Sequence, residues 1–226
     1  MSLKIRMILR WLLGVVFVSA VLFIPAGSAN FWQGWVLMGV VFISGASGMF
    51  YFYRNDPQLI ERRLKTKEKI GEQKLLIRLM MVALIAIYPL PGLDYRFGWS
   101  RRYLRAVPLW LEVLCQALVL GSFLFVIWVM KVNSFAARTI QVEAGQKVIS
   151  TGPYRIVRHP MYLGAVVMAL AIPLALVSFV AWPAFALLIL FYVFRLLDEE
   201  KFLRQDLPGY SEYCAQTRYH LIPFVW

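Results

Sequence analysis

Long apolar stretches alternate with short charged connections along most of the chain. Four of these stretches have about the length of a membrane-crossing helix: residues 7–24, 31–53, 75–93 and 107–130. A helix needs roughly 20 apolar residues to cross the hydrocarbon core of a bilayer. The pattern therefore predicts one transmembrane helix from each stretch.

A fifth apolar run, residues 161–194, contains no charged residue over 34 positions. At about 1.5 Å per residue a single helix of this length would extend roughly 50 Å, which is too long for one crossing. Pro173, Ser178 and the pair Trp182 and Pro183 interrupt the run, and proline breaks helices because it lacks a backbone donor. We expect two short helices that form a hairpin, with the turn near residues 177–183. The fold class that follows is an all-α integral membrane protein with about six transmembrane helices.

The composition excludes an ordinary soluble domain. Of the 226 residues, 61% are hydrophobic, and the mean hydropathy is +0.66, more apolar surface than a soluble fold shields from water. A transporter usually shows broken helices in two repeated halves, whereas this chain has one broken run. A non-catalytic transporter subunit or scaffold is kept as an alternative from another functional class.

The formal net charge of +12 at pH 7 suggests nucleic acid as a partner, but the positions of the basic residues argue against it. With six crossings and a cytoplasmic amino terminus, 20 of the 24 Lys and Arg residues fall on the cytoplasmic side, as the positive-inside rule requires. The other four, Arg96, Arg101, Arg102 and Arg105, fall on the opposite side. We therefore expect both termini in the cytoplasm, contacts with membrane lipids and no nucleic-acid partner.

Residues 1–130 and 131–226 differ in character. The first region consists of spans and one charged connection, residues 54–74, which is either an interfacial helix or a solvated loop. The second region holds most of the polar clusters. We assign the first region to a scaffold with lipid access and the second to catalysis. Cys115 and Cys214 have no metal-ligand partner at suitable spacing, so no metal site is expected.

A dense group of polar and aromatic residues precedes the predicted hairpin. Arg158, His159 and Pro160 stand at its start, with Tyr154 and Tyr162 on either side. Proline suits the first turn of a helix, where its missing N–H is harmless. A histidine beside an arginine is most often a solvated surface residue, but the flanking Tyr, Gly and Pro favour a binding loop at the membrane surface.

A charged cluster, residues 195–200, ends the hairpin. Arg195 and Glu199 are four residues apart and share a helix face, whereas Glu200 points about 100° away. The alternative is a cluster that only anchors the helix end at the membrane surface. Ionisable groups that face the protein interior at membrane depth are nevertheless candidates for function. Because a hairpin returns to its own side, His159 and Glu199 are expected to meet.

Together these residues resemble the isoprenylcysteine carboxyl methyltransferase family, which belongs to a wider group that includes the phospholipid methyltransferases. The resemblance is carried by the strings from Gly152 to Arg155 and from Arg158 to Gly164, the cluster 195–200, and the tail residues Gly209, Tyr210, Tyr213, Thr217, Tyr219, Leu221, Ile222 and Pro223. It is strong over residues 131–226, and looser over residues 56–62 and 94–99, which look like prokaryotic members. The pattern is specific for the superfamily and weak for the substrate.

The resemblance implies a cytoplasmic pocket for S-adenosylmethionine, built from the C-terminal half of the chain. The residues that it places around the cofactor are Gln141, Lys147, Val148, Ile149, Tyr154, Arg158, His159, Pro160, Tyr162 and Glu199. Arg195 is similar to an arginine that faces the methyl acceptor. The candidate catalytic residues are His159, Arg195, Glu199 and Glu200.

The expected reaction is methyl transfer to a lipophilic acceptor, either prenylated or otherwise lipid-like. Such a displacement mainly requires alignment of the reacting atoms and exclusion of water. A carboxylate acceptor needs little acid or base chemistry, and carboxyl O-methylation is the reaction that we favour. An amine acceptor, as in a phospholipid N-methyltransferase, must first lose a proton, for which His159 or Glu200 is a candidate. The chain lacks the glycine-rich fingerprint of a soluble nucleotide-binding fold.

Overall fold

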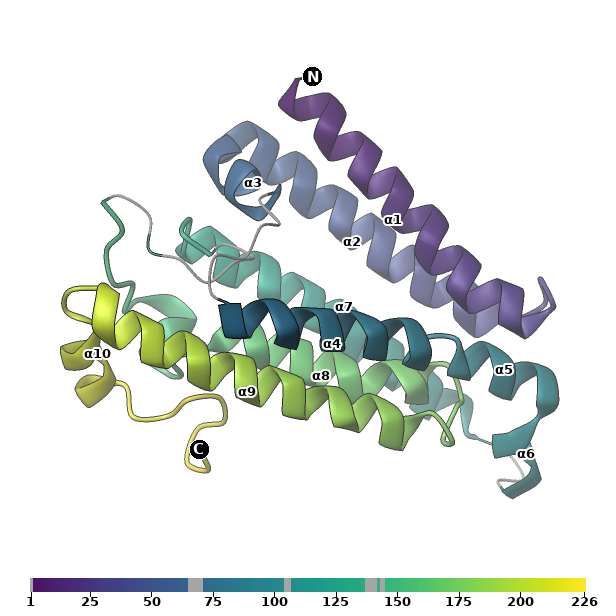
Figure 1. Cartoon of the computed structure of the whole chain (residues 1–226). Helices are drawn as coiled ribbons and strands as arrows, with labels where there is room; N and C mark the ends of the chain where they lie inside the picture. Colours follow the sequence, from purple (N-terminus) through teal and green to yellow (C-terminus); the bar gives the residue numbers. More distant parts are fainter. Residues whose placement is uncertain (1, 65–70, 104–106, 137–141, 143–144) are drawn as a thin grey trace.

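The chain folds into helices that run side by side, as the computed structural model in Figure 1 shows. The structure describes residues 2–64, 71–103, 107–136, 142 and 145–226. Within this part of the chain the elements are α1 (Leu3–Ala26), α2 (Trp32–Asn55), α3 (Pro57–Leu64), α4 (Gly71–Ile87), α5 (Leu90–Phe97), α6 (Trp99–Tyr103), α7 (Leu109–Val132), the 3-10 helix η1 (Gly152–Arg155), α8 (Pro160–Ala175), α9 (Trp182–Asp206) and α10 (Tyr210–Gln216). The described part contains no strand, so the prediction of an all-helical fold is confirmed.

Four segments of the described chain are long and apolar enough to cross a membrane. They are Leu3–Ala26, Trp32–Asn55, Lys74–Phe97 and Leu109–Val132. Large apolar side chains such as Leu13 and Val16 are about two-thirds exposed, which is favourable only where lipid surrounds them. The chain is thus a multi-pass membrane protein. The predicted count of six crossings and the predicted orientation stay predictions.

The apolar run 161–194 is divided between α8 and α9, which pack against each other. Residues 176–181 separate the two helices. Ser178 N donates to Pro173 O (2.8 Å), and Val177 has a positive φ of 57°. Pro183 lies in the first turn of α9, a position that suits proline. The break between α8 and α9 lies close to the predicted turn at residues 177–183: Pro173 is in the last turn of α8, and Trp182 and Pro183 begin α9. That both helices cross the membrane stays a prediction.

A buried carboxylate holds this turn to a distant part of the chain. Asp94 in α5 accepts hydrogen bonds from Ser178 Oγ (2.6 Å) and from Ser100 Oγ (2.5 Å). Ser100 Oγ in turn accepts from the backbone N–H groups of Phe179 and Val180. Paired buried polar groups of this kind rigidify a structure. The α8–α9 turn is therefore anchored at the end of the molecule that carries α5 and α6.

Close packing of α8 on α7 sets the position of the functional region. A Cβ atom at Gly164 would lie 2.6 Å from Val126 Cγ2, so only glycine permits this approach. The chain enters α8 at Pro160, on the end of the molecule that also carries α3 and α10 (Figure 1). The amino-terminal end of α1 and the C-terminal tail lie toward the same end (Figure 1). The entry to α8 and the charged end of α9 thus come together.

Candidate active site

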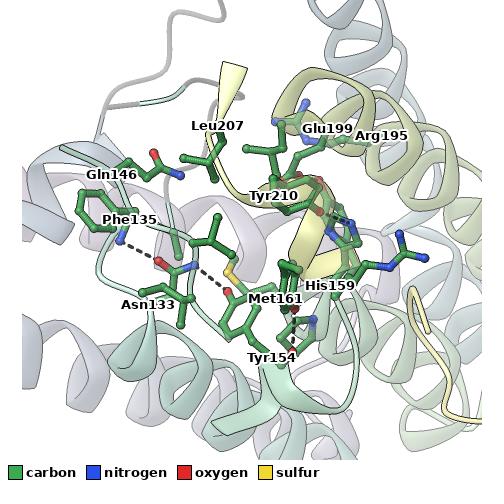
Figure 2. Close-up of a pocket in the computed structure, with 18 of the residues that line it drawn as sticks. Asn133, Phe135, Gln146, Tyr154, His159, Met161, Arg195, Glu199, Leu207 and Tyr210 are labelled. Carbon is green, nitrogen blue, oxygen red and sulfur yellow. Dashed lines mark hydrogen bonds between the residues drawn. The ribbon is translucent and has the colours of Figure 1, made fainter. Parts of the chain in front are cut away.

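A cavity of about 260 Å³ lies between the segment before α8, the first turns of α8 and the charged part of α9 (Figure 2). Nine of the residues that the resemblance places around the cofactor line this cavity: Lys147, Val148, Ile149, Tyr154, Arg158, His159, Pro160, Tyr162 and Glu199. Gln141 lies outside the described residues. Residues far apart in the sequence are therefore brought to one place, although their roles stay predictions.

His159, just before α8, and Glu199 of α9 line the same cavity. Tyr162 OH donates to Glu199 Oε2 (2.7 Å) and so joins α8 to α9. The His159 ring lies edge-on to the Tyr162 ring, with their centroids 5.9 Å apart. His159 is only 5% exposed, and its Nε2 lies 3.5 Å from Tyr210 OH. His159 is thus a buried part of the cavity wall rather than a solvated surface histidine.

Tyr154 is fixed by contacts on both its backbone and its side chain. Its hydroxyl accepts a hydrogen bond from Asn133 Nδ2 (3.0 Å), and its backbone oxygen accepts one from Tyr213 OH (2.7 Å). Burial raises the pKa of Tyr154 to about 12. The side chain therefore stays a neutral phenol at physiological pH, and it offers a ring face and a hydroxyl without charge.

Arg195 and Glu199 face the cavity from α9, where both are labelled in Figure 2. Arg195 is buried, at 9% exposure. It lies one helical turn before Glu199, on the same face of the helix. The cavity wall on α9 thus carries one cation and one carboxylate in adjacent turns.

Glu200 does not belong to the residues that line the cavity. It is buried and forms an ion pair with Arg158, and its Oε1 also accepts from Arg204 Nη2 (2.8 Å). Burial alone would raise the pKa of the Glu200 carboxyl, but His159, Arg204, Arg158 and His220 together lower it to about 2. Glu200 is therefore ionised at any physiological pH. Its surroundings favour support of Arg158 over direct contact with a substrate.

Several lining residues carried no signal in the sequence. Asn133, Phe135 and Gln146 line the cavity (Figure 2), as do Arg63 of α3 and Met80 of α4. Residues 1–130 thus contribute directly to the cavity wall. Tyr210 and Tyr213 also line it; they were part of the family resemblance but had no predicted role.

Helix α3 reaches the cavity because it is tied to the chain after α7. Arg62 Nη1 donates to Ser134 O (2.8 Å), and its guanidinium lies over the Phe135 ring, 4.8 Å from the centroid. Arg63 Nη1 donates to Ala136 O (3.1 Å). Residues 54–74 were expected to form either an interfacial helix or a solvated loop. The part of this segment described as α3 is a helix. Arginines in a charged connection resemble any cytoplasmic basic residue, so sequence alone could not single them out.

A second cavity, of about 300 Å³, lies deeper between the helices. It is lined mostly by apolar side chains of α1, α2, α4, α5, α7, α8 and α9, and none of the described charged residues contributes to its wall. Ala165 of α8 and Tyr192 of α9 line both this cavity and the polar one. These two residues therefore form a wall that the polar cavity and the apolar cavity share.

Comparisons with known proteins give a family match and a structural match. Residues 110–208 match the sequence profile of the phospholipid methyltransferase family. The chain resembles the solved structure of the eukaryotic intramembrane Ras methyltransferase ICMT (isoprenylcysteine carboxyl methyltransferase), with a TM-score of 0.50 at 15% identity, over 98% of this chain and 85% of that one. At this identity the likeness shows the fold.

A shorter match is to the Delta(14)-sterol reductase of Mus musculus. The two chains are 34% identical over 94 residues, which make up 39% of this chain and 22% of the reductase. This chain thus spans about a fifth of the curated relative that it matches. That the chain is of prokaryotic type stays a prediction. The segment that builds most of the cavity wall thus matches a phospholipid methyltransferase family profile, and the chain shares its fold over nearly the whole length with an isoprenylcysteine carboxyl methyltransferase.

Proposed function

We propose that this protein transfers a methyl group from S-adenosylmethionine to a lipophilic acceptor, on the cytoplasmic side of the membrane. The observation that carries the proposal is that the two cavities share Ala165 and Tyr192 in their walls. A charged, water-soluble cofactor suits the polar cavity, and a hydrocarbon chain suits the apolar one. A reaction between the two requires that the cavities meet.

The lining residues fit the chemistry of the cofactor. Its positively charged sulfonium is matched by the Glu199 carboxylate and by the ring faces of Tyr154 and Tyr162, which attract cations. Lys147 offers a positive charge for the amino-acid carboxylate, and Val148 and Ile149 offer apolar surface for the adenine. The cofactor supplies an electrophilic methyl group. The protein holds the two partners in line and keeps water out.

For the acceptor, we favour carboxyl O-methylation of the isoprenylcysteine type. Arg195 can hold a carboxylate with two parallel hydrogen bonds, and a carboxylate reacts without loss of a proton. Phospholipid N-methylation is the second candidate, because residues 110–208 match that family. An amine acceptor must release one proton, and His159 is the nearest base in the cavity wall.

The first prediction is that wild-type protein purified in detergent binds S-adenosylmethionine in a calorimetric titration. Replacing His159 or Glu199 by alanine should weaken binding by roughly tenfold or more, because each change removes a polar group from a buried site. The matched control is Val225→Ala, since this side chain is 76% exposed. Membrane lipids incubated with isotopically labelled cofactor would then identify the acceptor by mass.

Two outcomes would contradict the proposal. If wild-type protein does not bind S-adenosylmethionine at millimolar concentration, the chain is not a methyltransferase of this type. Binding of a reduced nicotinamide cofactor instead would favour reductase chemistry, in line with the match to a sterol reductase. Absence of binding to both cofactors would favour the transporter or scaffold alternative.

The second prediction concerns the junction of the two cavities. Ala165→Phe should block the junction, so methylation of the lipophilic acceptor should fall by roughly tenfold or more, as expected when remote binding of the substrate chain is lost. Affinity for S-adenosylmethionine should stay within about threefold, because the polar cavity keeps its charged wall. Leu187→Phe is the control, since Leu187 is exposed on the outer face of α9. Full methylation by a folded Ala165→Phe variant would mean that the acceptor does not pass this junction.

A further inference from the structure

The C-terminal tail runs alongside the segment that enters α8. Arg158 N donates to Tyr219 O (2.9 Å), and His159 N donates to His220 O (3.0 Å). Arg158 Nη2 also donates to Arg218 O (2.9 Å). Two consecutive residues of the cavity wall thus depend on the tail for their backbone hydrogen bonds.

His220 lies where the tail meets the buried ion pair of Arg158 and Glu200. Its Nδ1 lies 3.2 Å from Arg158 Nη2, and its Nε2 lies 2.9 Å from Glu200 Oε2. One face of the His220 ring is covered by the Trp226 indole, with ring centroids 4.8 Å apart and ring planes at 19° to each other. Trp226 is held in turn, because its backbone oxygen accepts from the N–H groups of Leu221 and Ile222. The imidazole is therefore fixed between two charged groups.

One protonation state of His220 suits both neighbours. With the proton on Nε2, Nδ1 can accept from the Arg158 guanidinium while the Nε2–H faces the Glu200 carboxylate. Glu200 Oε2 has no hydrogen-bond partner of suitable geometry within the described chain. Its contact with His220 Nε2 is therefore an electrostatic attraction between the N–H group and the carboxylate. A second proton on the ring would place a donor against the guanidinium. Burial lowers the pKa of His220 below its usual 6.5, which favours the neutral ring.

We propose that His220, as a neutral imidazole, is a positioning residue that fixes Arg158 and Glu200 and thereby the cavity wall formed by Arg158 and His159. The binding measurements that test this inference rest on the proposed function. The contacts of His220 with Arg158 and Glu200 do not depend on any substrate. His220 touches no part of the cavity itself, since it is not a lining residue. Its effect therefore passes through Arg158.

The sign of the pH dependence follows from the groups around the ring. Glu200 favours the protonated ring, whereas Arg158, His159, Arg204 and the burial of the ring disfavour it. The competent state carries the neutral ring. Affinity for S-adenosylmethionine should therefore be constant above pH 6.5 and should fall as the pH drops below this value.

The third prediction tests the role of His220 with two variants. His220→Ala should weaken S-adenosylmethionine binding at pH 7.5 by roughly tenfold, as expected when a buried charged group loses a hydrogen-bond partner. His220→Gln offers an acceptor and a donor on one amide but cannot become charged. It should bind within about threefold of wild type at pH 7.5 and lose the decline at low pH. Val225→Ala in the same tail should behave as wild type in both respects.

Hydrogen–deuterium exchange tests the same inference without any ligand. The amides of Arg158 and His159 should exchange faster in His220→Ala and at the wild-type rate in His220→Gln. Unchanged exchange in His220→Ala would overturn the inference, whether or not the protein binds the cofactor. So would a wild-type pH profile in His220→Gln, because the decline at low pH would then not arise from His220. If wild-type protein fails to bind while exchange follows the prediction, the proposed function fails and the positioning role stands.

Discussion

Replacing Glu200 by alanine is expected to destabilise the folded chain by about 3–5 kcal/mol, the usual result of removing one partner from a buried ion pair. Arg158 and Glu200 are both almost fully buried, with side chains 6% exposed. Without the carboxylate, the Arg158 guanidinium keeps its backbone contact with Arg218 but loses its counter-charge. The measurement is the unfolding midpoint of purified protein in detergent.

Controls separate a lost charge from a lost volume. Glu212→Ala removes an exposed carboxylate from α10 and should shift the midpoint little. Replacing Arg158 and Glu200 together by methionine should recover most of the stability, because a buried ion pair is often no more stable than apolar side chains of similar size. That double variant should still bind S-adenosylmethionine poorly, because Arg158 lines the cavity. A loss below 1 kcal/mol in Glu200→Ala would mean that the pair is open to water.

The lowered pKa of the Glu200 carboxyl predicts that the folded chain loses stability in acid. The pKa of Glu200 lies at about 2 in the folded chain, against an ordinary value of 4.5. A carboxyl whose pKa is lowered on folding stabilises the folded state above its unfolded pKa. This contribution is therefore fully present above pH 4.5 and is lost as the pH falls toward 2. Glu200→Gln should show a smaller decline across this range.

The arrangement around the hairpin could be predicted because a few local rules determine it. Pro173 lies in the last turn of α8, and the pair Trp182 and Pro183 stands at the start of α9. A hairpin returns to its own side, so the start of α8 and the end of α9 had to approach each other. That was enough to expect His159 and Glu199 in one place. Local breaks in an apolar run are visible in sequence because proline acts on its own helix.

Contacts between distant elements could not be predicted in this way. Asp94 and Ser178 are 84 residues apart and meet only because α5 and the α8–α9 turn pack together. The position of Arg63 in the cavity wall likewise depends on how α3 contacts residues 134–136. Helix geometry predicts that Glu199 and Glu200 point about 100° apart. It does not predict which of the two faces the cavity. The family resemblance, rather than helix geometry, indicated that Glu199 faces the cavity.

Arg195 is expected to serve the acceptor more than the cofactor. It lies four residues before Glu199, hence about 6 Å deeper along α9, and it lines the polar cavity close to Tyr192, where the apolar cavity begins. The polar head of a lipophilic acceptor would arrive at this level, while its chain stays in the apolar cavity. A guanidinium can grip a carboxylate there with two hydrogen bonds, and a lysine ammonium cannot reproduce that fork.

Methyl transfer should therefore fall by about 100-fold in Arg195→Ala and by roughly 10-fold or more in Arg195→Lys, a loss of at least about 1.4 kcal/mol in the transition state. Affinity for S-adenosylmethionine should stay within a few-fold of wild type in both variants, because Glu199, Tyr154 and His159 are unchanged. The measurement is a comparison of turnover with cofactor affinity for each variant. Lys201→Ala, an exposed change on the same helix, is the control.

Equal loss of cofactor binding and turnover would mean that Arg195 only anchors the helix end. Full activity in Arg195→Lys would mean that no paired hydrogen bonds hold the acceptor, and an amine acceptor would then be favoured over a carboxylate.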